Sequence, residues 1–177
     1  MTDPVAAQYE ALPYPARDPR DERRRLIVGS PSHLDEVNHY VFGGRLDFAR
    51  PFRALVAGGG TGDATVMLAQ QMADRGVPGE VVQLDMSRAS RRVAEARVTA
   101  RGLTNVRFVT GSLLDAGEVA PGPYDYIDCC GVLHHLEDPA AGLRALVAVL
   151  APQGGLGLMV YGMFGRAGVY EVQDLLR

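Results

Sequence analysis

The sequence predicts the α/β fold class: a doubly wound, mostly parallel sheet of five core strands with helices on both faces. Two observations predict it. Short apolar runs alternate along the 177 residues with longer segments whose apolar residues recur at helical spacing. Several of the apolar runs end at glycine or at a polar residue, as buried parallel strands commonly do. We expect an N-terminal arm over 1–30 and a folded domain over 31–177, with its core at 53–161.

The expected strands are the short apolar runs. In chain order they span residues 53–57, 80–84, 106–110, 124–130 and 155–161. The run at 53–57 leads into glycines, and the run at 80–84 ends at Asp85. A doubly wound sheet usually continues past a fifth strand, whereas here an amphipathic pattern only begins at 169–177. We therefore expect that C-terminal strands are missing from this chain.

Helices are expected between these strands. A short helix is expected over 33–42 and a longer one over 61–75, where apolar residues lie on one face. Ser87 can cap the next helix, and Asp138 with Pro139 can open the last. The residues of these two helices that are expected to face inward are Val93, Ala96, Ala100, Leu143, Leu146, Val147 and Leu150. The arginines expected to face water are Arg88, Arg91 and Arg92.

The first thirty residues form, in our interpretation, an extended arm. Four of the 11 prolines fall here, and an arginine-rich charge run over 17–25 lacks helical periodicity. Two interpretations remain open. The arm is either a flap over a ligand site, carried by Tyr9, Leu12 and Tyr14, or a terminus that is loose or merely packed on the domain.

Composition excludes several classes of protein. All 18 basic residues are arginine, which excludes P-loop nucleotide hydrolases and enzymes that use a lysine Schiff base. A net charge of −3 argues against a dedicated nucleic-acid surface. No apolar run reaches the roughly 18 residues of a membrane span, and the N-terminus lacks the pattern of a secretory signal. The adjacent Cys129 and Cys130 cannot build a disulfide framework, which favours a cytoplasmic location.

A glycine cluster lies between the first expected strand and the first long helix. Gly58, Gly59, Gly60 and Gly62 permit a tight turn and the close approach of a ligand, although a tight turn alone would also use glycine. The dinucleotide fingerprint G-x-G-x-x-G would place its third glycine at position 63, which is Asp63. Because that carboxylate lies where a pyrophosphate would bind, the motif favours a ligand with a cationic end.

Further candidate residues follow the other strands. Asp85 ends the second strand, where a carboxylate can accept both hydroxyls of a ribose, and Ser87 is available for the helix cap that Asp85 might otherwise provide. After the third strand, Ser112 and Leu113 are placed to flank a purine ring. The segment 124–139 contains the fourth strand and the turn after it. Since the carboxyl ends of parallel strands meet at one edge of a sheet, we expect one ligand site there.

The glycine cluster, Asp85 and the segment 124–139, which ends in VLHHLEDP, together resemble the class I S-adenosylmethionine-dependent methyltransferases over about 53–161. The resemblance implies a Rossmann-like fold with S-adenosylmethionine as the cofactor and no metal. It also implies that Asp85 holds the ribose hydroxyls and that Met86 lies against the adenine. The other cofactor-binding residues that it implies are Gly58, Gly59, Gly60, Gly62, Ser112, Leu113, Cys130 and Gly131.

Methyl transfer is an in-line displacement at an activated carbon, so the protein mainly aligns the reactants and excludes water. A base is needed only if the acceptor loses a proton. The candidates are His134, His135 and Asp128, each of which can equally have a structural role. Cys129 and Cys130 are interpreted as small buried strand residues.

The function predicted from these observations is S-adenosylmethionine-dependent methyl transfer to a small-molecule acceptor, without a nucleic-acid or membrane partner. One alternative is a cofactor-binding or regulatory module without its own catalysis, as a fragment of a larger enzyme would be. Another is a nicotinamide-dependent oxidoreductase, which Asp63 disfavours. An exposed edge of the sheet would favour a homodimer.

Overall fold

The computed structural model describes residues 4–29, 31–162 and 164–176. Its centre is a five-stranded sheet with the strand order β3-β2-β1-β4-β5, in which all four pairings are parallel. The strands are β1 (Phe52–Ala57), β2 (Gly79–Asp85), β3 (Val106–Thr110), β4 (Tyr124–Cys130) and β5 (Leu150–Met159). The doubly wound α/β fold is therefore confirmed, and the sheet is wholly rather than mostly parallel.

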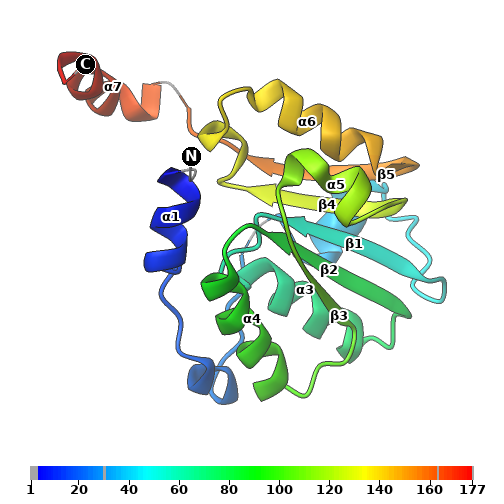
Figure 1. Cartoon of the computed structure of the whole chain (residues 1–177). Helices are drawn as coiled ribbons and strands as arrows, with labels where there is room; N and C mark the ends of the chain where they lie inside the picture. Colours follow the sequence, from blue (N-terminus) through cyan, green and yellow to red (C-terminus); the bar gives the residue numbers. More distant parts are fainter. Residues whose placement is uncertain (1–3, 30, 163, 177) are drawn as a thin grey trace.

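Helices cover both faces of this sheet (Figure 1). The longer ones are α3 (Asp63–Asp74), α4 (Arg88–Ala100) and α6 (Pro139–Ala148). The shorter helices and turns are α2 (Leu34–Glu36), η2 (Val37–Val41), η3 (Leu113–Asp115), α5 (Ala116–Val119) and η4 (Leu133–His135). After β5 come η5 (Phe164–Arg166) and α7 (Ala167–Leu175), which extends away from the sheet in Figure 1.

Alternation along the strands divides the core into two apolar clusters. In β1, Leu55 packs on the face covered by α5 and α6, whereas Ala54 and Val56 pack on the face covered by α2 and α3. Leu68 of α3 and Leu146 of α6 are fully buried in these two clusters. This burial on both sides explains why the strands read as continuous apolar runs.

Several boundaries and faces differ from the sequence-based expectations. The fifth strand begins at Leu150, which was expected to face inward from α6, and Val147 of α6 is half exposed. In α4 the buried residues are Ser90, Ala94, Arg97 and Val98, whereas Ala96 and Ala100 are exposed. The prediction of the buried face of α4 was wrong because that face includes an arginine. Arg97 is 0% exposed, and carboxylates from other segments neutralise it.

The N-terminal arm is not simply extended. It contains α1 (Pro4–Ala11) and the 3-10 turn η1 (Pro19–Arg23), and both contact α4. In Figure 1 the arm runs along one side of the domain as the blue segment. Asp18 caps η1 by accepting a hydrogen bond from the Arg20 amide, which explains a helical turn inside a charge run without helical periodicity. The division into an arm and a domain stays a prediction.

Candidate functional site

The glycine loop after β1 is shaped by close contacts with other protein segments. Gly58 has a φ of 75°, and a Cβ there would lie 2.4 Å from a methyl carbon of Val132. Gly60 has a φ of 53°, and a Cβ there would lie 2.6 Å from the carbonyl oxygen of Tyr14 in the arm. Both positions therefore require glycine. The loop fits tightly between the turn after β4 and the arm.

Asp85, at the carboxyl end of β2, is held toward this loop. Its Oδ2 accepts a hydrogen bond from the Gly60 amide at 2.7 Å, and its Oδ1 accepts one from the Ser87 amide at 2.8 Å. Burial raises the pKa of Asp85, while the two backbone donors act in the opposite direction. The predicted cap is confirmed as well, because the Ser87 hydroxyl accepts from the Ser90 amide. Asp85 is thus a fixed acceptor beside the glycine loop.

A cavity of about 360 Å³ lies at the carboxyl ends of the strands. Nine of the ten predicted cofactor-binding residues line it: Gly58, Gly59, Gly60, Asp85, Met86, Ser112, Leu113, Cys130 and Gly131. The tenth, Gly62, instead precedes α3 as its N-cap residue and packs against Ala94 of α4. The structure therefore brings the predicted residues to one cavity, whereas their contact with a cofactor stays a prediction.

The N-terminal arm forms one wall of this cavity. Tyr9, Tyr14 and Pro15 line it, whereas Leu12 is 70% exposed and does not. The Thr61 hydroxyl donates a hydrogen bond to the Pro15 carbonyl at 2.7 Å, which joins the arm to the glycine loop. Of the two interpretations of the arm, the one that places Tyr9 and Tyr14 at the ligand site agrees with this geometry.

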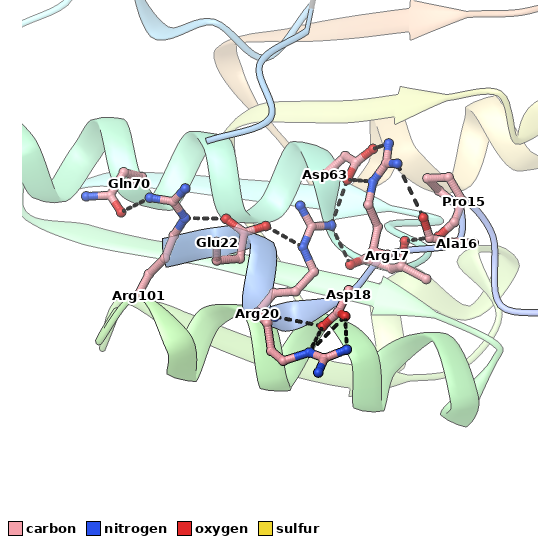
Figure 2. A network of polar contacts seen from close by, with 11 residues as sticks. Pro15, Ala16, Arg17, Asp18, Arg20, Glu22, Asp63, Gln70 and Arg101 are labelled. Atoms are coloured by element: carbon pink, nitrogen blue, oxygen red, sulfur yellow. Dashed lines mark hydrogen bonds and ion pairs between the residues drawn. The ribbon is translucent and has the colours of Figure 1, made fainter. Parts of the chain in front are cut away.

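A network of ion pairs anchors the arm to α3 and α4 (Figure 2). Arg17 binds both carboxylate oxygens of Asp63, at 2.8 and 2.6 Å. Arg97 reaches Asp63 at 2.7 Å, the Thr61 carbonyl at 2.8 Å and Glu22 at 2.7 Å. Glu22 is also bound by Arg101 and is 6% exposed. We call Arg17, Glu22, Asp63, Arg97 and Arg101 the arm network.

The arm network corrects the interpretation of Asp63. That carboxylate was expected to suit a cationic end of a ligand, but Arg17 and Arg97 already neutralise it. Burial alone would raise the pKa of Asp63, and the hydrogen bonds and charges of the two arginines outweigh this and lower it. No motif indicated the arm network, because the residues that it pairs are separated by up to 79 positions in the sequence.

The two adjacent histidines lie in different surroundings. His135 lines the cavity, and its ring centroid lies 6.3 Å from that of Tyr9. His134 lies outside the cavity lining and stacks on Tyr161 with ring centroids 3.8 Å apart. Burial, His135 and Arg166 lower the pKa of His134. Of the three candidate bases, His135 and Asp128 line the cavity and His134 does not.

Other residues of the cavity wall were not expected from the sequence. Met159 and Tyr161, at and just beyond the end of β5, line it together with Val132 and Leu136. The rule that ligands bind at the carboxyl ends of parallel strands could have indicated Met159 and Tyr161. Both cysteines are free thiols, and burial raises the pKa of each to about 12. Cys129 is buried as expected, whereas Cys130 is only partly buried and lines the cavity.

A second cavity of about 580 Å³ lies at the opposite end of the strands, around Phe52 at the start of β1 and Asp125 at the start of β4. None of the predicted site residues lines it. The glycine loop and the carboxyl ends of the strands are remote from it, so the smaller cavity is the candidate site.

The site has the features of a nucleotide-type cofactor site in a doubly wound sheet. These are the glycine loop after β1, the carboxylate at the end of β2 and the cavity along the carboxyl edge. Residues 55–156 match the family model described as the methyltransferase domain. The chain belongs to this family, and S-adenosylmethionine is the cofactor that membership implies. The nicotinamide alternative is thereby set aside.

Similar proteins agree with this assignment. The chain is 35% identical to an uncharacterised protein of Synechococcus sp. over 99% of this chain and 41% of that protein. It is 29% identical to the ubiquinone biosynthesis O-methyltransferase of Leptothrix cholodnii over 84% of this chain and 58% of that protein. It is 33% identical to the tRNA 5-carboxymethoxyuridine methyltransferase of Escherichia coli over 64% of this chain and 41% of that protein. The chain thus spans about half the length of these relatives.

A solved structure supports the fold. The S-adenosylmethionine-dependent methyltransferase of Clostridium acetobutylicum matches with a TM-score of 0.64 and 18% identity, over 93% of this chain and 59% of that one. In the described part of the chain, no helix has the length and apolar character needed to cross a membrane.

Proposed function

We propose that this chain forms the S-adenosylmethionine-binding domain of a methyltransferase that acts on a small-molecule acceptor. The observation that carries the proposal is the cavity at the carboxyl edge, which collects the glycine loop, Asp85 and the turns after β3 and β4 in one place. A cytoplasmic location and a homodimer through the edge strand β5 remain parts of the proposal, the former supported by free thiols.

The cavity wall suggests how the cofactor would lie. Ser112 and Leu113 follow β3 and Met86 follows β2, so they would flank the adenine. Asp85, fixed by two backbone amides, would accept hydrogen bonds from the ribose hydroxyls. The methionine part would then extend past the glycine loop toward Gly131 after β4. The bound cofactor supplies a methyl group on a positively charged sulfur.

The remaining wall would receive the acceptor. Tyr9, His135 and Tyr161 bring aromatic surfaces to it, and Met159 adds an apolar one. Among the described residues, no arginine lines the cavity, which favours an uncharged or aromatic small molecule over a phosphate-bearing polymer. The arm and these rings exclude water from the reaction. His135 would accept a proton from an acceptor that must lose one.

A transfer-RNA acceptor is the second candidate, because one relative carries the name of a tRNA methyltransferase. An assay with radiolabelled S-adenosylmethionine separates the two. We expect label in small phenols, carboxylic acids or amines and none in bulk tRNA. Transfer to tRNA alone would replace the small-molecule acceptor in the proposal.

The cofactor itself is tested by calorimetric titration with S-adenosylmethionine, S-adenosylhomocysteine and NADH in parallel. We expect selective binding of the first two at micromolar strength, about −8 kcal/mol. Binding without transfer to any acceptor would favour the alternative of a non-catalytic module. Failure of both S-adenosyl ligands to bind would overturn the proposal.

A further inference from the structure

Among the described residues, three carboxylates line the candidate cavity, and they differ in what neutralises them. Asp63 is paired with Arg17 and Arg97 of the arm network. Asp85 accepts hydrogen bonds from two backbone amides. Asp128, near the carboxyl end of β4, is 2% exposed and has no cationic side chain against it among the described residues. A buried carboxylate without a cation is unfavourable, so Asp128 differs from the other two.

The surroundings of Asp128 are polar but uncharged. Its Oδ2 accepts a hydrogen bond from the hydroxyl of Ser32, the residue two positions before α2. The titratable groups that face it are Tyr126 and Cys130 of its own strand and the neighbouring Cys129. Burial raises the pKa of Asp128, while hydrogen bonds from Ser32 and Cys130 act in the opposite direction. None of the described residues places a positive charge beside Asp128.

The position of Asp128 indicates which part of a ligand it would meet. In the strand order β2-β1-β4, Asp85 ends β2 and Asp128 lies two strands away, opposite Val56 of β1. A ligand whose ribose lies at Asp85 therefore extends across the glycine loop and reaches β4 with its far end. In S-adenosylmethionine that far end carries a protonated amino group.

We propose that Asp128 binds the α-ammonium group at the methionine end of the cofactor. This inference rests on the proposed function, because it requires an S-adenosyl ligand in the cavity. The ammonium neutralises Asp128 and accounts for a buried carboxylate on the cavity wall. Asp128 is then a cofactor-binding residue rather than a general base.

The test compares two ligands that differ at this end. S-adenosylhomocysteine carries the ammonium group, whereas 5′-methylthioadenosine has the same adenosine and sulfur without the amino-acid end. We expect Asp128→Asn to lower the affinity for S-adenosylhomocysteine about 10- to 100-fold, the range for a hydrogen bond to a charged group. The affinity for 5′-methylthioadenosine should change less than about twofold. Ser32→Ala is the matched control, because it removes the hydroxyl and keeps the charge.

The outcomes are distinct. If Asp128→Asn lowers the affinity for both ligands equally, or lowers neither, the proposed role of Asp128 is overturned. Failure of both ligands to bind the unaltered chain would overturn the proposed function together with this inference. If Asp128→Asn does not fold, the pH dependence of binding to the unaltered chain decides: because protonation of Asp128 removes the charge that the ammonium would meet, the affinity for S-adenosylhomocysteine should fall relative to that for 5′-methylthioadenosine as pH is lowered. An equal pH dependence of the two affinities would contradict the inference.

Discussion

The sheet and the N-terminal arm both contribute walls to the same cavity, but they are held in place differently. Leu55, Val82 and Ile127 of the sheet are fully buried among apolar side chains. The arm is held mainly by polar contacts, with Glu22 between two arginines and Glu10 accepting a hydrogen bond from the Ala89 amide at the start of α4. Apolar burial is non-directional, whereas each ion pair requires one particular partner.

This difference separates two kinds of stability. Loss of an apolar contact in the sheet weakens the whole domain, because the strands unfold together. Loss of a contact in the arm network can be relieved by local release of the arm, so its effect on global stability is limited to the free energy of docking the arm. The following substitutions test this separation.

The largest effect is expected from Leu55→Ala in β1. The change removes a fully buried side chain and leaves a cavity, which lowers the free energy of unfolding by about 3 kcal/mol. Urea unfolding followed by circular dichroism measures it. Leu12→Ala, at an exposed position of the arm, should change stability by less than about 0.5 kcal/mol. Comparable losses for both would contradict the comparison.

Asp85→Ala should have the next largest effect, on binding rather than folding. The change removes the proposed ribose acceptor and leaves the Gly60 and Ser87 amides without their partner. We expect S-adenosylhomocysteine affinity to fall about 100-fold, or about 2.7 kcal/mol, in calorimetric titration. Asp138→Ala, which alters an exposed cap of α6, is the control. Unchanged affinity of Asp85→Ala would remove the ribose role.

Glu22→Gln tests the arm itself. The change removes a buried charge between Arg97 and Arg101. We expect the free energy of docking the arm to fall by about 1–2 kcal/mol, so that the arm detaches more often. This is less than the usual cost of breaking a buried ion pair, because detachment of the arm exposes the unpaired arginines to water. Trypsin should then cut faster after Arg23, while the urea midpoint changes little. Asp18→Asn, which breaks an exposed pair with Arg20, should leave cleavage unchanged. A large fall in the urea midpoint would show that arm and sheet unfold together.

The smallest effect is expected from acid. Because Arg17 and Arg97 lower the pKa of Asp63 below its ordinary 3.8, docking of the arm is fully stabilised above about pH 3.8 and weakens as pH falls through the lowered value. Hydrogen exchange over residues 17–23, corrected for intrinsic rates, should show this weakening as pH falls below about 3.8, the ordinary carboxylate pKa. Asp63→Asn should show none in that range. The same pH dependence in both would assign it to other carboxylates.

Much of the fold could be predicted because its signals are local. The strands β3 and β4 lie where the apolar runs indicated, and Ser87 and Asp138 cap α4 and α6 as expected. The error in α4 arose where burial depends on distant partners. Arg97 was not recognised as a buried residue because Glu22 and Asp63, which neutralise it, come from segments far away in the sequence.

The sequence by itself determined the order of strands and helices, the glycine loop and the carboxyl-edge positions of Asp85 and Ser112. These follow from periodicity, capping and the rule that parallel strands end at one edge. Only the tertiary structure decided that the arm lines the cavity, that Asp63 is already neutralised and that none of the described residues brings a cation to Asp128. The reason is physical: periodicity reports which face of an element is buried, whereas the charge state of a buried carboxylate depends on the side chains that other segments bring to it.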